Sequence, residues 1–213
     1  VYAPVVNISR DQRWGRAQES YGEDVLLNSA FGVAYVKALE GSGVISTPKH
    51  FVDNYGEGGH DSYPSVTSWR VLREVYLEPF RACFQEGGAR SVMSSYNYLN
   101  GVYTSENPEL LTTVLRDEWG FKGMVMTDWY GGTNTKAQMI AGNDMLQPGR
   151  DTQYTDLVQL MSTGEIDMKV IDRNIKRILE LILQSPKFKG YEYSNNPDLA
   201  AHADVTRQSA TEG

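Results

Sequence analysis

The chain has 213 residues, of which 40% are hydrophobic and 22% charged; this composition is typical of folded globular proteins and excludes a disordered chain. Its formal net charge is −7, without a block of like charges, so the basic surface that binds nucleic acid is not expected. The sequence also contains no apolar run close to the ~20 residues that a membrane helix needs. We therefore predict neither nucleic acid nor a membrane as a partner.

The start of the sequence and its cysteine content bear on where the protein works. The chain begins with Val1 instead of an initiator Met and carries no signal-like segment, so we expect a fragment or a processed chain and leave its compartment open. Its one cysteine, Cys83, has no partner for an intrachain disulfide and falls in a helical pattern. We expect a small buried hydrophobic side chain there, with a reactive thiol as the alternative.

Five short apolar runs, each followed by polar or Gly-rich residues, are the strand candidates. Their apolar residues are continuous rather than alternating, which is typical of strands that are covered on both faces in a parallel sheet. The runs are residues 1–9, 43–51, 91–97, 123–129 and 143–148.

Helical patterns lie between these runs and after them. Apolar residues repeat at helical spacing over residues 24–39, 67–86 and 171–182. The stretch SENPELLTTVLRDEWG predicts a further helix with Asn107 as its N-cap, Pro108 at its first position and Gly120 as its stop. Strands that alternate with helices indicate an α/β fold.

The strand count separates two α/β architectures. A closed (β/α)8 barrel has eight strands and about 250 residues, whereas five candidates are present and the first begins at residue 1. All five end on hydrogen-bonding residues, as expected where barrel strands surround a site; a doubly wound sheet would concentrate such residues at one switch point. We predict an incomplete (β/α)8 TIM-type barrel over residues 1–190, about its last five strands, completed by upstream strands. An open five-stranded sheet is the alternative.

The sequence GMVMTDWYGG places Asp128 at a strand end, between apolar residues and a Gly pair that lets the chain turn sharply. A buried carboxylate costs several kcal/mol unless charges or donors satisfy it. Its candidate partners at other strand ends are Arg16, Lys49, His50 and Tyr96. Such cations would keep the carboxylate ionised and its pKa low, which suits a nucleophile and not a general acid. A structural Asp that caps the following loop is the alternative.

Residues beside Asp128 and at a neighbouring strand end offer further binding groups. Trp129 presents a flat apolar face, the kind of surface on which the C–H face of a sugar ring packs, and a plain core tryptophan is the alternative. Lys49 and His50 are consecutive, and successive side chains of a strand point to opposite faces. If both serve one pocket, the backbone there must be irregular. Otherwise Lys49 lies on the surface and His50 is a buried imidazole.

Two polar loops flank these strands. Residues 9–24 contain three arginines and four carboxylates around Trp14, which predicts a braced polar network or, alternatively, a salt-bridged surface loop. Residues 53–63 are Gly-rich and form a candidate lid. The spacing of Glu57, His60 and Asp61 matches no standard metal-ligand pattern, and neither GxGxxG nor GxxxxGK[ST] occurs. We therefore predict no metal and no nucleotide cofactor.

Five of these stretches, taken together and in this order, resemble glycoside hydrolase family 3, the family of β-glucosidases and β-xylosidases. They are RWGRAQESYGED, PKHF, SVMSSYN, GMVMTDW and AGNDML. The resemblance covers essentially the whole chain, and five ordered motifs are more specific than any one of them. It implies the barrel domain of that family, which an αβα sandwich domain follows, with residues 191–213 as the linker toward the second domain.

The resemblance also implies roles for individual residues. In that family the Asp of the DW pair is the catalytic nucleophile, which would be Asp128 here, and configuration is retained through a covalent glycosyl-enzyme. Glu19 would brace the terminal sugar subsite from behind. The residues that would line this subsite are Arg16, Lys49, His50, Met93 and Tyr96.

Two groups of the family pattern have no counterpart among these residues. The family subsite uses an Asp from an early barrel segment, and the usual acid/base is a Glu of the second domain, which the rest of the polypeptide or a second chain would supply. In a hexosaminidase branch an Asp–His dyad after KHF takes that role. Here Tyr63 stands in the place of the histidine, which argues against that branch.

The expected function is removal of a terminal non-reducing β-D-glucosyl residue from a gluco-oligosaccharide or an aryl or alkyl β-glucoside, without a cofactor. The alternatives are a β-xylosidase or another family member with a different sugar or with phosphate as acceptor, and a non-catalytic carbohydrate-binding barrel. The family resemblance alone favours a secreted or periplasmic location.

Overall fold

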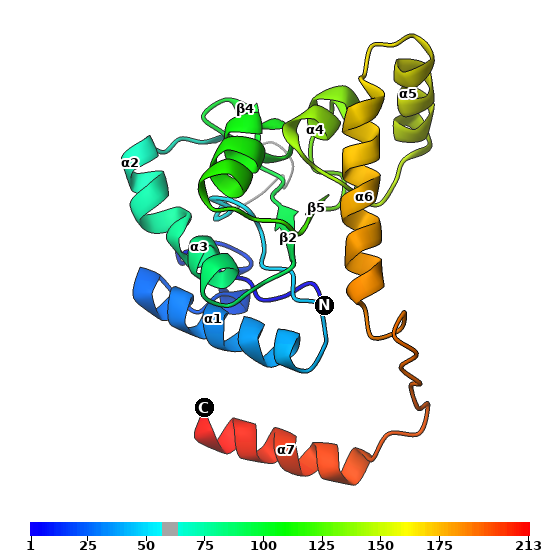
Figure 1. Cartoon of the computed structure of the whole chain (residues 1–213). Coiled ribbons are helices and arrows are strands. Elements are labelled where there is room, and N and C mark those ends of the chain that lie inside the picture. The colour runs from blue at the N-terminus through cyan, green and yellow to red at the C-terminus, as the bar shows by residue number, and fades with distance from the viewer. Residues whose placement is uncertain (57–63) are drawn as a thin grey trace.

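Parallel strand pairing forms the centre of the computed structural model, which describes residues 1–56 and 64–213 (Figure 1). Two extended strands, β2 (Ser91–Ser94) and β5 (Met124–Thr127), pair in parallel along their whole length. The other three expected strands join this pair through isolated parallel bridges, which connect Val5 with Lys49, Phe51 with Ser94, and Met126 with Met145.

The order of the paired segments decides between the two predicted architectures. Neighbours in the sheet are also neighbours along the chain, from the segment around Val5 to the segment around Met145. A doubly wound sheet reverses its strand order at the switch point, whereas consecutive parallel strands are the repeating unit of the (β/α)8 barrel. The predicted piece of a barrel is therefore confirmed. Only two of the five runs are regular strands; Pro4 and Pro48 interrupt two others, because proline lacks the N–H of a ladder.

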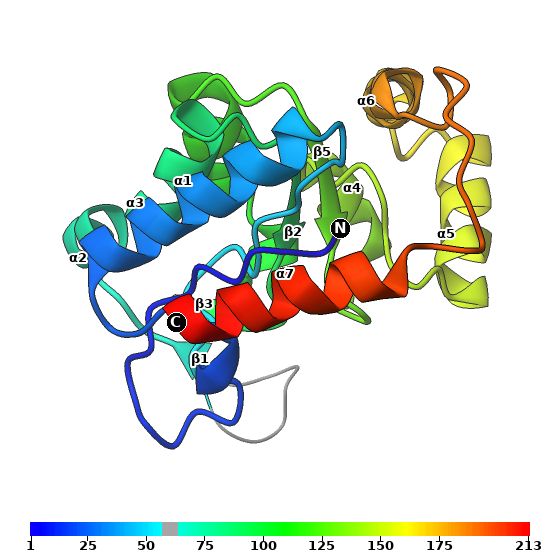
Figure 2. The same ribbon diagram turned by 90° about the horizontal axis from the view of Figure 1, so that it is seen from below.

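Helices surround these strands, and both views place α5 and α6 on the opposite side of β2 and β5 from α1 and α3 (Figures 1 and 2). The α-helices are α1 (Val25–Gly41), α2 (Trp69–Val71), α3 (Glu78–Gln85), α4 (Thr135–Ala141), α5 (Asp151–Ser162), α6 (Met168–Gln184) and α7 (Leu199–Glu212). Wider π-helical turns form η2 (Leu72–Tyr76) and η4 (Glu109–Glu118), and 3-10 turns form η1 (Ala17–Glu19) and η3 (Thr104–Glu106). A small separate sheet contains β1 (Pro64–Ser65), β3 (Tyr98–Leu99) and β4 (Val102–Tyr103).

The predicted helices are present, with two differences in type. The pattern over 67–86 is divided into α2, η2 and α3, and the helix after Asn107 is the π-helical η4. Its predicted ends hold, because the Asn107 side chain accepts a hydrogen bond from the Leu110 N–H at 3.3 Å and Gly120 has a φ of +71°. The helices α4, α5 and α7 were not predicted.

The main core lies between the strands and the helices α1, α3 and η4. Val92 and Val125 contribute to it from β2 and β5, and Phe51 from the strand beside β2; all three are fully buried. Cys83 is also fully buried there, as predicted, and burial raises the pKa of its thiol to about 12. Close packing of α1 on α3 requires Gly32, since a Cβ at that position would lie 2.8 Å from the Cys83 Sγ.

The last helix stands apart from this core. Figure 1 shows α7 separated from the other helices, and every residue of 191–213 is exposed. Among the described residues, no helix has both the length and the apolar content needed to cross a membrane.

Candidate active site

Asp128 follows β5 and is only 6% exposed. Its backbone N–H donates to the Ser94 carbonyl at 3.1 Å, which fixes the strand end against β2. The two carboxylate oxygens differ: Oδ1 accepts a hydrogen bond from the Trp129 N–H at 2.7 Å, whereas Oδ2 has no hydrogen-bond partner among the described residues. Oδ2 faces the Nε2 of His50 at 3.5 Å, beyond the usual length of such a bond.

The pKa of Asp128 differs from the prediction. Burial raises it above the ordinary value, although the Trp129 N–H, Arg16, the Tyr96 hydroxyl and Lys49 all lower it. The expected cations and donors are therefore present, but the expected low pKa is wrong, because loss of hydration outweighs them in this site. A poorly hydrated, more basic carboxylate remains suited to nucleophilic attack.

Lys49 and His50 both lie near Asp128, since the Nε2 of His50 is 3.5 Å from its Oδ2 and the charge of Lys49 lowers its pKa. The peptide bond between the two residues is cis. Lys49 is half-buried, and burial together with Arg16 lowers the pKa of its ammonium group, while Glu19 and Asp128 raise it. His50 is 1% exposed. Burial and the charges of Arg16 and Lys49 hold its pKa well below the ordinary histidine value, so the imidazole is neutral.

Arg16 and Glu19 form a two-pronged ion pair around the turn η1. The Arg16 Nε lies 2.7 Å from one Glu19 oxygen, and its terminal nitrogen lies 3.0 Å from the other. The second pair of this loop, Arg13 with Asp11, is local and largely exposed. The loop over 9–24 is therefore braced by short-range pairs. Arg16 is also coupled electrostatically to Asp128.

The remaining predicted subsite residues are placed in two ways. Tyr96 lies near Asp128, because its hydroxyl lowers the pKa of that carboxyl group. Trp129 is 40% exposed, with its ring edge-to-face against Tyr2 at 6.1 Å between centroids, and is open to a ligand. Met93 is 2% exposed and packs with Met124 and Met126, and its place in the sugar subsite stays a prediction.

Two further expectations concern the lid and metal ions. The candidate lid residues Glu57, His60 and Asp61, together with Tyr63, lie outside the described residues. Within residues 1–56 and 64–213, no group of three or more His, Cys, Asp or Glu side chains is arranged to hold a metal ion.

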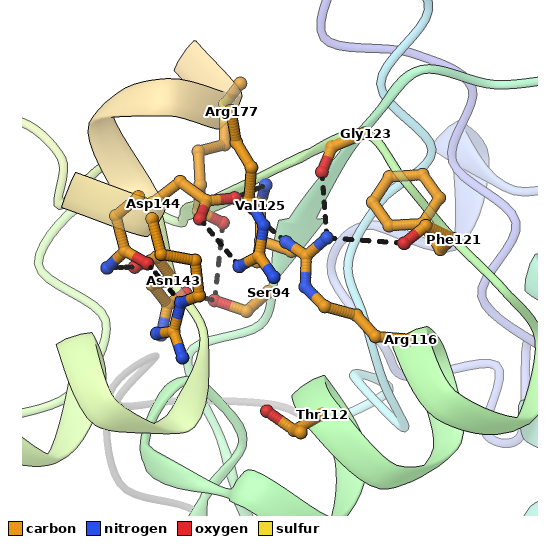
Figure 3. Close-up of polar contacts among 12 residues, drawn as sticks. Ser94, Thr112, Arg116, Phe121, Gly123, Val125, Asn143, Asp144 and Arg177 are labelled. Carbon is orange, nitrogen blue, oxygen red and sulfur yellow. Dashed lines mark hydrogen bonds and ion pairs between the residues drawn. The ribbon is translucent and has the colours of Figure 1, made fainter. Parts of the chain in front are cut away.

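The strand next to β5 is anchored by a buried ion-pair network around Asp144 (Figure 3). One Asp144 oxygen accepts from Arg116 at 2.9 Å and from the Val125 N–H at 2.8 Å, and the other accepts from Arg177 at 3.1 Å. Burial lowers the pKa of the Arg116 guanidinium to about 10. The network joins η4, β5 and α6, and it holds the strand end that follows Asp144 beside the end carrying Asp128.

Asn7, for which the sequence predicts no role, contacts His50 in the structure. Asn7 is 3% exposed, and its amide makes two bonds of 2.8 Å with the main chain of His50. An amide inside an apolar strand needs buried partners, and this requirement was the signal available in the sequence.

The geometry agrees with comparisons against known proteins. Residues 1–181 match the model of the glycosyl hydrolase family 3 N-terminal domain. A β-glucosidase of Rhizobium radiobacter is 44% identical over 94% of this chain and 24% of its own length. A probable β-glucosidase I of Aspergillus niger is 35% identical over 100% of the chain and 26% of its own length. The chain thus spans about a quarter of the length of these relatives.

Solved structures show the same similarity in three dimensions. The β-glucosidase 3B of Thermotoga neapolitana in complex with glucose aligns with a TM-score of 0.92 at 40% identity, over 96% of this chain and 30% of that chain. A β-glucosidase of Bifidobacterium adolescentis aligns with a TM-score of 0.91 at 32% identity, over 98% of this chain and 31% of that chain.

Proposed function

This chain belongs to glycosyl hydrolase family 3, and from that premise we propose that it supplies the nucleophile-bearing part of the active site of a retaining exo-β-glucosidase. The substrate would be a gluco-oligosaccharide or an aryl or alkyl β-glucoside with a terminal non-reducing glucosyl residue. The observation that carries the proposal is the carboxylate of Asp128, which is buried at a strand end and has one oxygen without a hydrogen-bond partner among residues 1–56 and 64–213.

The two oxygens of Asp128 would have different roles in the reaction. Oδ1 is held by the Trp129 N–H, which fixes the plane of the carboxylate. Oδ2 retains its lone pairs and is the oxygen that would attack the anomeric carbon. The bond to the leaving group would break as the glycosyl–enzyme ester forms, and water would then release the sugar with retained configuration. A protonated acid would assist departure of the aglycone from about 5 to 5.5 Å away.

Other residues of the site would bind the sugar. Arg16, Lys49 and Tyr96 act on the pKa of Asp128 and carry hydrogen-bond donors, which would suit the hydroxyl oxygens of a sugar. The exposed ring of Trp129 would pack on the sugar or the aglycone. The acid/base would be a Glu from the rest of the same polypeptide or from a second chain.

The division of the chain follows the same proposal. Residues 1–190 would form the C-terminal part of the catalytic barrel, and residues 191–213 would lead toward a second domain. The family model ends at residue 181 and all of 191–213 is exposed, which supports a connecting role for the helix α7.

A mechanism-based 2-deoxy-2-fluoroglucoside tests the proposal in the full-length protein. This reagent forms a glycosyl–enzyme that hydrolyses slowly, so intact mass should increase by one fluoroglucosyl group and peptide mapping should place the label on Asp128. A label on another carboxylate would reject Asp128 as the nucleophile. A folded protein that takes no label and turns over no aryl glycoside would favour the carbohydrate-binding barrel.

A further inference from the structure

The imidazole of His50 lies between two hydrogen-bond acceptors. Its Nδ1 is 3.2 Å from the Asn7 Oδ1, and its Nε2 is 3.5 Å from the Asp128 Oδ2. Both neighbours are side chains at strand ends, and all three residues are at least nine-tenths buried. A neutral imidazole carries one proton, so only one of the two contacts can be a hydrogen bond.

The orientation of the Asn7 amide is fixed by the backbone of His50. The amide nitrogen Nδ2 donates to the His50 carbonyl at 2.8 Å, and the oxygen Oδ1 accepts from the His50 N–H at 2.8 Å. Turning the amide over would set donor against donor and acceptor against acceptor in these two contacts. The atom that faces Nδ1 is therefore an oxygen.

This orientation decides where the imidazole proton resides. With the proton on Nδ1, the ring donates to Asn7 within hydrogen-bond distance. With the proton on Nε2, two lone pairs would meet at 3.2 Å, and the bond gained at Asp128 would be the longer one. A doubly protonated ring would satisfy both neighbours, but burial and the charges of Arg16 and Lys49 oppose it.

We propose that Asn7 is a positioning residue of the active site, which holds the His50 proton on Nδ1 so that His50 offers an unprotonated Nε2 to a substrate hydroxyl. The inference rests on the proposed glycosidase function. It has a second consequence for Asp128, because an Nε2 without a proton leaves the Oδ2 lone pairs available for attack. Two adjacent acceptors in a buried site also select a ligand group that donates hydrogen, as a sugar hydroxyl does, and disfavour an anionic group.

The proton position is measured by neutron diffraction on deuterium-exchanged crystals of the wild-type full-length protein. We expect deuterium on the His50 Nδ1 and none on Nε2. Deuterium on Nε2, with or without deuterium on Nδ1, would overturn the inference.

The functional consequence is tested with Asn7→Leu. This variant keeps a similar side-chain volume and removes both hydrogen bonds between the Asn7 side chain and the His50 main chain. The released ring is expected to place its proton on Nε2 and bond Asp128 Oδ2, which lowers the rate of glycosyl–enzyme formation roughly tenfold to a hundredfold. Asn7→Asp keeps an oxygen acceptor facing the His50 Nδ1, so the proton should stay on Nδ1. The added negative charge should shift the acidic limb of the plot of kcat against pH. An unchanged rate and pH profile in both variants would contradict a positioning role.

A matched control separates positioning from packing. Asn174 on α6 is as deeply buried as Asn7, and its amide donates to the Asn143 carbonyl at 2.8 Å, a contact that involves neither His50 nor Asp128. Asn174→Leu should keep the labelling rate of the folded fraction within about twofold of wild type. The inference and the proposed function can be tested independently. Neutron diffraction locates the His50 proton whether or not Asp128 takes the fluoroglucosyl label.

Discussion

The Nε2 of His50 lies 3.5 Å from the Oδ2 of Asp128, and this contact is not an ion pair. The imidazole is neutral because burial and two nearby cations oppose its protonation. The carboxylate has lost most of its water, and its pKa is raised. The proposed nucleophile therefore lies beside an uncharged imidazole, and the charges of Arg16 and Lys49 act on its carboxyl group.

The first prediction concerns the attacking group itself. Replacing Asp128 with alanine in the full-length protein should lower kcat by several orders of magnitude, because the proposed ester forms on the Asp128 carboxylate and alanine has no oxygen that could replace it. The fold should persist, since Asp128 anchors its strand through its backbone N–H. Steady-state kinetics on an aryl β-glucoside and circular dichroism check both statements. More than a tenth of wild-type activity would remove Asp128 from the nucleophile role.

The raised pKa of Asp128 also predicts a stability change. A carboxyl group whose pKa is higher in the folded than in the unfolded state loses protein stability as pH rises through the interval between those two values. Asp128→Asn cannot ionise, so it should melt at a higher temperature than wild type at neutral pH. The advantage should disappear below the ordinary aspartate pKa, where both proteins carry a neutral group.

Thermal melts of wild type and Asp128→Asn at a series of pH values test this prediction. The sign is informative, because a salt-bridged aspartate with a depressed pKa would give the opposite result. An Asn variant that is less stable than wild type at neutral pH would show that the cations, and not the loss of water, dominate at this position.

The ion pair between Arg16 and Glu19 predicts an effect on substrate binding. Glu19→Gln removes one charge and one of the two bonds that hold the Arg16 guanidinium. We expect the less firmly held Arg16 to weaken sugar binding by about 1.4 kcal/mol, which would raise KM about tenfold. The control is Asp11→Asn, which breaks the equivalent but exposed pair with Arg13 in the same loop. Equal KM values in the two variants would separate Glu19 from the subsite.

The Asp144 network predicts a large effect on stability alone. Asp144→Asn leaves the guanidinium groups of Arg116 and Arg177 without a compensating charge inside the protein. Breaking a buried pair in this way costs about 3 to 5 kcal/mol. Asp204→Asn, which removes a highly exposed pair with Arg207, should cost less than about 1 kcal/mol. Urea denaturation compares the two variants, and similar midpoints would contradict the assigned importance of the network.

The positions of the five parallel-paired segments and the buried place of Asp128 at a strand end were predictable from sequence because their causes are local, whereas the catalytic role of Asp128 stays a prediction. Buried parallel strands require continuous apolar runs, and a lone carboxylate at the end of such a run, as in GMVMTDW, indicates a site. The direction of the Asp128 pKa depends on the competition between lost hydration and nearby cations, which no local pattern reports. The orientation of Met93 and the clamp of Asn7 on His50 similarly depend on how separate strands pack together.

Helices were missed where the sequence lacks an apolar stripe. The residues of α7 are exposed throughout, so LAAHADVTRQSATE shows no periodicity for a core to impose. The helix α4 is only seven residues long, too short for a clear pattern. The helix α6 was predicted because its hydrophobic residues repeat strongly, and this repeat has a further consequence for the isolated chain.

The apolar residues of α6 lie on more than one side of the helix. Ile171 is buried and Ile178 packs against the methionine cluster, whereas Ile175, Leu179 and Ile182 remain 48%, 53% and 49% exposed. Exposed apolar surface of this kind marks a contact with another segment or an aggregation risk. The segments around Val5 and Met145 are also the two outermost of the five paired strands, and their outer edges can pair with other chains.

The isolated 213-residue chain is therefore expected to associate in solution. Sedimentation velocity should show oligomers that grow with concentration, and a hydrophobic dye should bind more strongly than to the full-length protein. Leu179→Gln with Ile182→Gln should reduce both signals, because these changes remove apolar surface from α6 and leave the buried face intact. The strand edges remain in that variant, so some association should persist. A monomeric isolated chain that melts cooperatively would show that the five-stranded piece is stable without further strands.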